Sequence, residues 1–91
     1  MNYQALGEYT AFKKQAKDAA NNRGYLINNL MFDLRRARDD NPESIDTTRL
    51  HARINELEKS DNDMRDALAR ANNSGIECGQ QALSVADLLR K

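Results

Sequence analysis

The chain has 91 residues, enough for one small domain. Its 14 Lys and Arg residues balance its 14 Asp and Glu residues, so the zero formal charge gives no general attraction to nucleic acid or to an anionic membrane. The content of one proline, four glycines and 31% charged residues favours solvated helices over strands.

Cysteine usage and hydropathy narrow the class of protein further. Cys78 is the only cysteine, so no disulfide forms within the chain. No apolar run is long enough for a signal peptide or a membrane span. We therefore expect a cytoplasmic protein that does not enter the membrane.

The first helix is expected to span residues 3–38, because no proline interrupts this stretch. Gly7 and Gly24 each weaken the helix by about 1 kcal/mol relative to alanine without preventing it. Gly24 follows two asparagines, so a kink or a break at this point is the alternative.

Residues spaced three and four apart in this helix form a heptad-like stripe, typical of a helix that packs along a partner helix. The stripe is weak near the N-terminus and strongest between Ile27 and Leu34. Its members are Leu6, Tyr9, Lys13, Ala16, Ala20, Arg23, Ile27, Leu30, Leu34 and Ala37.

A turn around Pro42 leads to a second helix over residues 47–72, with Asp46 or Thr47 as its N-cap. The run Asn72-Asn73-Ser74-Gly75 is expected to end it. Its stripe again alternates spacings of four and three, and comprises Leu50, Ile54, Leu57, Asp61, Met64, Leu68 and Ala71.

A third helix is expected over residues 75–90, because Ser74 and Glu77 match a capping box. Ser84 and Asp87 form a second possible capping box, so the helix could instead begin late. The fold predicted for the single domain 1–91 is therefore all-α, with a long antiparallel helical hairpin and a shorter C-terminal third helix.

The two stripes match each other residue by residue. In an antiparallel pair, facing residues have numbers that add to one constant total. Pairing Leu34 with Leu50 also pairs Leu30 with Ile54, Ile27 with Leu57, Ala20 with Met64 and Ala16 with Leu68. The same register places Arg23 opposite Asp61, the polar residue that interrupts the second stripe. We predict that these opposite charges pair and fix the register, although either could instead face solvent or a partner.

Several apolar residues lie outside the stripes. Tyr25 and Phe32 are seven residues apart on the first helix with Phe12 on their flank, and Leu88 and Leu89 lie on the third. We expect them to form a partner or self-association surface, with a homodimer favoured. The alternative is a monomeric three-helix bundle in which the third helix covers the stripe.

No catalytic, cofactor or metal motif survives inspection. His51 lacks the partner spacings of a metal or acid–base site. The run Asp61-Asn62-Asp63 resembles the opening of a calcium loop, but Arg65 and Asp66 break the pattern. We expect a non-enzymatic interaction or regulatory protein without a cofactor.

The alternative function is that of a nucleic-acid accessory factor. It would use two small basic clusters, Lys13, Lys14 and Lys17 and then Arg35, Arg36 and Arg38. Asp39 and Asp40 follow the second cluster and would repel phosphate, and no aromatic residues interleave with it for base stacking. Nucleic acid is therefore the less favoured partner.

Overall fold

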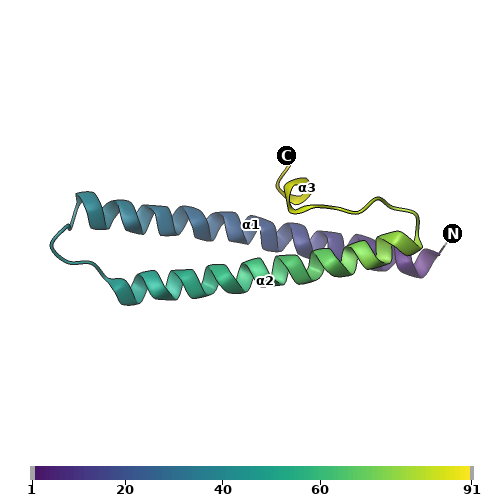
Figure 1. Ribbon diagram of the computed structural model, residues 1–91, viewed down its shortest axis with the longest axis horizontal. Helices are drawn as coiled ribbons and strands as arrows, with labels where there is room; N and C mark the ends of the chain where they lie inside the picture. Colours follow the sequence, from purple (N-terminus) through teal and green to yellow (C-terminus); the bar gives the residue numbers. More distant parts are fainter. Residues whose placement is uncertain (1, 91) are drawn as a thin grey trace.

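The computed structural model describes residues 2–90, and within them the chain is a long hairpin of two antiparallel helices with a short third helix beside it (Figure 1). The helices are α1 (Tyr3–Asp39), α2 (Thr47–Glu77) and α3 (Val85–Leu89). The predicted all-α hairpin is confirmed.

The molecule is a rod rather than a globule. It measures 61 × 23 × 14 Å, and its radius of gyration is 17.3 Å, whereas a compact domain of this length has a value of about 12 Å. Its accessible surface is 6639 Å², against about 5,400 Å² for a compact 10.3 kDa protein. The chain therefore leaves unusually much of its surface in contact with solvent.

α1 is continuous along its whole length. It begins at Asn2, whose side-chain Oδ1 accepts a hydrogen bond from Ala5 N at 3.0 Å. Gly24 lies inside the helix, so the break considered there does not occur. A β-carbon at Gly24 would meet no other group within 4 Å, so no close contact requires glycine at this position.

The predicted end of the second helix at residue 72 is wrong, because α2 continues to Glu77. The side chain of Ser74 bonds across to α1 instead of capping a new helix. After the C-cap residue Cys78 the chain turns away at Gly79, which has a φ of +81°. Gln80 N donates to Gly75 O at 2.8 Å and Gly79 N to Ile76 O at 3.4 Å, the pattern of a Schellman motif.

The predicted third helix over residues 75–90 is therefore also wrong. α3 spans only Val85–Leu89, and the later of the two capping boxes begins it. Asp87 N donates to Ser84 Oγ at 3.2 Å, while Ser84 N donates to Asp87 Oδ2 at 2.8 Å. Residues 80–84 belong to no helix or strand, and together with α3 they form a segment that we call the C-terminal arm (residues 80–89).

The predicted pairing of Arg23 with Asp61 is present, with Arg23 Nε 3.0 Å from Asp61 Oδ1. This contact sets α1 and α2 in the antiparallel register that the matching stripes predict. The tight end of the hairpin lies at α1 residues 5–20 and α2 residues 60–75. Towards the turn the helices splay apart, as Figure 1 shows at its left end.

The half of the α1 stripe that is buried is the opposite of the half predicted. Its supposedly strongest members, Ile27 and Leu34, are 37% and 50% exposed, and Ile54 is 49% exposed. Instead Leu26 is buried, and most of the core lies at the end of the hairpin away from the turn, where alanines pack with Tyr9, Met64 and Leu88. In the part of α1 near the turn the contact line is rotated by one position, because Leu26 and Asp33 point at α2 where Ile27 and Leu34 were expected.

Two helical glycines differ in their surroundings, which gives a test of the fold. Replacing Gly24 with alanine should raise the free energy of unfolding by up to about 1 kcal/mol, because alanine has the higher helix propensity. That gain corresponds to a rise of roughly 4–8 °C in the melting temperature of a domain this small.

Gly75→Ala is the matched control, because a β-carbon there would lie 3.1 Å from the Tyr9 ring. Thermal unfolding followed by circular dichroism should show a clearly smaller gain, or a loss, for Gly75→Ala. A lower melting temperature for Gly24→Ala would contradict a continuous α1.

Candidate interaction surface

Polar contacts cross the interface between α1 and α2 at several levels. Ser74 Oγ donates to Glu8 Oε2 at 3.2 Å. Further along, the buried Ser60 Oγ donates to Ala19 O at 3.1 Å and accepts from Asn22 Nδ2 at 3.0 Å. These bonds satisfy polar groups that would otherwise be costly to bury. Each bond forms in only one alignment of the two helices.

Asp61 lies between two arginines. Its Oδ2 accepts from Arg65 Nε at 3.0 Å, and its buried Oδ1 lies 3.0 Å from Arg23 Nε without hydrogen-bond geometry. The side chains of Arg23 and Asp61 are 25% and 29% exposed, so solvent screens their attraction only in part. The contact is therefore an ion pair between the helices whose main value lies in alignment.

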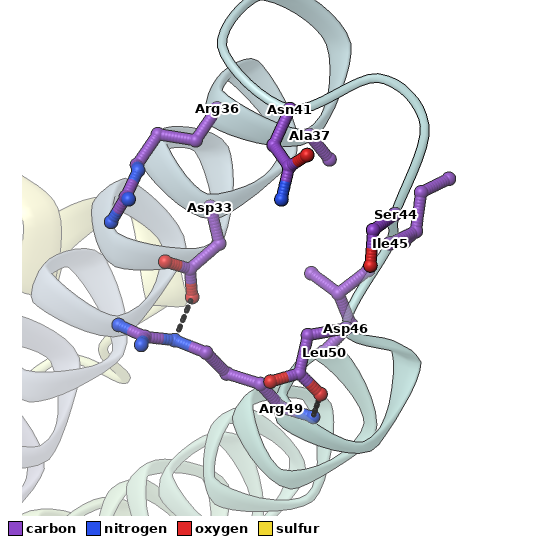
Figure 2. A pocket seen from close by; sticks show the side chains of 9 residues that line it. All are labelled: Asp33, Arg36, Ala37, Asn41, Ser44, Ile45, Asp46, Arg49 and Leu50. Atoms are coloured by element: carbon purple, nitrogen blue, oxygen red, sulfur yellow. Dashed lines mark hydrogen bonds and ion pairs between the residues drawn. The ribbon is translucent and has the colours of Figure 1, made fainter.

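Asp33 is a buried carboxylate that the sequence patterns did not single out. Its side chain is only 7% exposed and accepts from Arg53 Nε at 3.2 Å and from Arg49 Nε at 3.4 Å. Figure 2 shows it pointing from α1 towards Arg49 in an open cavity of about 200 Å³ beside the turn. The spacing of four residues between the two arginines on α2 was the signal that could have revealed this contact.

The C-terminal arm covers one flank of the hairpin near its tight end. Leu88 is 3% exposed and packs in the main apolar cluster, with Ala16 and Ala20 of α1 and Met64 and Ala67 of α2. The arm is also tied to α2 by one amide side chain. Asn72 Nδ2 donates to Leu83 O at 2.9 Å, and Leu83 N donates to Asn72 Oδ1 at 2.7 Å.

The same flank is uncovered beyond the end of the arm. Ala20, Ile27 and Leu34 follow one another at intervals of seven, so they share one side of α1. Ala20 is fully buried under the arm's cluster, whereas Ile27 and Leu34 are exposed. On α2, Ile54 lies beside Ile27 on this flank, where both line one shallow depression.

We call this uncovered part the distal face; it comprises Ile27, Met31, Leu34 and Ile54. Their exposed fractions are 37%, 54%, 50% and 49%. A large aliphatic residue presents about 200 Å² when it is fully exposed, so these four residues together expose roughly 400 Å² of apolar surface. Apolar patches of this size on monomeric proteins are often functional. Leu30, Leu50 and Leu57 lie half-buried at its base.

Of the residues expected to form an association surface, Tyr25, Leu88 and Leu89 line one open cavity between α1 and α3, whereas Phe12 and Phe32 do not. Tyr25, Phe32 and Leu89 are at least half exposed, and they lie outside the distal face. Leu88 was expected to be free for a partner, but it is buried because the short α3 inserts it into the chain's own core. Phe12 is half-buried, with the Arg70 guanidinium 5.8 Å from its ring.

The two basic clusters are partly neutralised and lie apart. Lys14 Nζ contacts Asp18 at 2.8 Å, and Arg38 makes two bonds to Asp39 at 2.7 and 2.8 Å. The hydrogen bond from Arg38 holds the pKa of the Asp39 carboxyl below its usual value. Between Lys17 and Arg35 the helix rises about 27 Å, so the clusters do not form one basic patch.

Among residues 2–90 no three His, Cys, Asp or Glu side chains converge as metal ligands. No helix in this range is long and apolar enough to cross a membrane. No family model matches the chain, and no similar curated protein or solved structure was found.

Asn72 offers a direct test of how the arm is attached. Asn72→Ala removes two short hydrogen bonds and leaves the Leu83 amide without its partner, at a cost of about 1–3 kcal/mol. Limited proteolysis should then cleave within residues 80–89 several-fold faster. Asn73→Ala changes an exposed neighbour on the same helix and should leave the rate unchanged. Equal rates in both variants would contradict attachment through Asn72.

The capping box of α3 should respond to pH. Hydrogen bonds from the backbone N–H and the hydroxyl of Ser84 lower the pKa of Asp87 below its usual 3.8. A lowered pKa in the folded state means that the stabilisation is present above pH 3.8 and is lost as the pH falls through the folded value. NMR titration should find the Asp87 midpoint below 3.8, and Ser84→Ala should raise it. An unchanged midpoint in that variant would contradict the capping box.

Proposed function

We propose that this chain is a non-enzymatic protein–protein interaction module that binds an amphipathic helix on its distal face. The observation that supports this function most strongly is the partial cover of one flank. The arm buries the flank as far as Ala20, and the apolar side chains that continue it are then left about half exposed.

The chemistry of the distal face fits a helix better than a small molecule. Its four apolar residues form a strip along two adjacent helices, and the depression between them is open rather than enclosed. A helix with apolar residues at intervals of three and four would fill such a groove, as the arm does with Leu88 on the same flank. Arg23, Asp61 and Arg65 would border the docked helix with polar contacts.

Photo-crosslinking tests the proposed surface in cells. A benzophenone amino acid in place of Met31 should give discrete protein adducts, because this position lies on the distal face. The same amino acid in place of exposed Asn62 is the control and should give none. Ile27→Glu in the Met31-labelled chain should remove the adducts, because a carboxylate is costly to bury in an apolar contact.

The nucleic-acid alternative makes a different prediction in the same cells and in vitro. It requires retention on DNA or RNA at low salt that weakens steeply as salt is added. No adducts from Met31, together with salt-dependent retention that is lost when Lys13, Lys17 and Arg35 are neutralised, would overturn the proposed function.

A further inference from the structure

We infer that the occupant of the distal face is a second copy of this chain, bound through an antiparallel contact between the two α1 helices. This inference rests on the proposed function and specifies its partner. Two copies would overlap by the uncovered half of each hairpin only, and the two arms would lie at opposite ends of the overlap.

Three residues of the first stripe continue along this flank of α1 beside a neighbouring column. Ala20, Ile27 and Leu34 form one column, and Gly24, Met31 and Arg38 form the adjacent column four residues on. These are the two columns through which a coiled coil makes contact. From Gly24 to Leu34 they are separate from the line of Leu26, Leu30 and Asp33, whereas Ala20 is already buried in the cluster that joins α1 to α2.

In an antiparallel coiled coil, a residue of one column faces a residue of the other column in the partner. Aligning two copies of α1 in this way places Ile27 opposite Met31 of the second copy, and Met31 opposite its Ile27. The next layer on either side places Leu34 of one copy opposite Gly24 of the other. A β-carbon at Gly24 would meet nothing within 4 Å, and Gly24 lines an open cavity of about 740 Å³ together with Leu88 and Leu89, so we place the incoming leucine in this cavity.

This alignment places α2 suitably as well. Arg23 lies level with Asp61, so Leu30, seven residues further along α1, lies level with Ile54. The twofold axis of the paired α1 helices passes between Ile27 and Met31, within about one residue rise of that level. Ile54 of each copy therefore lies level with the axis and on the same flank as Ile27, so we expect it near its own symmetry mate.

The arm limits how far the copies can overlap. If two hairpins paired in parallel along their whole length, both α3 helices would lie at the same level between the two α1 helices. Leu88 already occupies the flank of α1 at that level. In the half-overlapped arrangement the turn of one copy lies at the end of the other copy's α3. In this register the uncovered residues of one copy face uncovered residues of the other from Gly24 to Leu34, a length of about 15 Å.

The area available fits one weak dimer interface. About 400 Å² of apolar surface from each copy corresponds to roughly half of a standard interface, and neighbouring polar atoms supply the rest. The isolated chain also exposes about 1,200 Å² more than a compact protein of its mass, so burial of this size is available from surface it already displays.

The first experiment measures mass against concentration by analytical ultracentrifugation. The unmodified chain should convert from monomer to dimer in the micromolar range. Met31→Glu should weaken dimerisation at least about tenfold, because it buries a carboxylate in the apolar contact. Phe32→Glu is the matched control: Phe32 is 57% exposed, similar to Met31 at 54%, but lies outside the two columns. It should leave the dimer unchanged, and circular dichroism should show both variants folded.

The second experiment tests the position of the axis. In a Cys78→Ser background, Ile54→Cys should give covalent dimers with a short bis-maleimide reagent at least about tenfold faster than Phe32→Cys. A chain that stays monomeric up to millimolar concentration, or equal rates for the two cysteine variants, would overturn the inference.

The photo-crosslinking at Met31 separates this inference from the proposed function. Adducts at twice the mass of the chain support both. Adducts only at other masses support the interaction function and overturn the second copy as occupant. No adducts, with monomeric behaviour in the centrifuge, overturn both.

Discussion

The antiparallel contact between α1 and α2 is the interaction on which every other feature of this protein depends. No further layer of structure supports the hairpin along most of its length, so the alignment of the two helices is decided within one interface. Small side chains at Ala16, Ala20 and Ala71 let the helices approach closely at one end. Polar contacts at Glu8–Ser74 and Arg23–Asp61 occur at fixed levels along it. A shift of the register would break them together, while the apolar contacts alone would tolerate it better.

The polar contacts contribute more to alignment than to stability. A partly buried ion pair recovers in attraction about what its groups lose in hydration, so its net contribution is small. The same balance between lost hydration and gained attraction applies to Asp33. Its carboxylate is nearly buried and therefore requires Arg49 and Arg53 as partners. The apolar core supplies the stability, and it is concentrated where Met64 and Leu88 join the helices. The end near the turn is consequently the weaker half of the rod.

The C-terminal arm explains why one flank of the hairpin is buried near its tight end and exposed near the turn. α3 has five residues and contributes one buried leucine, which packs at the level of Ala16 and Ala20. The apolar columns of α1 continue past that level to Leu34 because the helix itself continues. An incoming helix therefore finds the tight end occupied and the distal end open. This difference, rather than the total number of apolar residues, locates the proposed contact and restricts its extent.

The sequence by itself determined the helices of the hairpin, the turn at Pro42 and the pairing of Arg23 with Asp61. Each of these follows from short-range spacing or from matching two periodic patterns, which the order of residues contains. Tertiary structure alone decided which side of each stripe was buried. Leu26 and Ile27 both fit a pattern with spacings of three and four, and only the packing of the two helices decided that Leu26 is buried and Ile27 is exposed. It also decided the end of α2, since Ser74 has a partner in Glu8 that local capping rules cannot foresee. The burial of Leu88 likewise depended on where a short extended segment led the chain, a long-range outcome that local patterns do not specify.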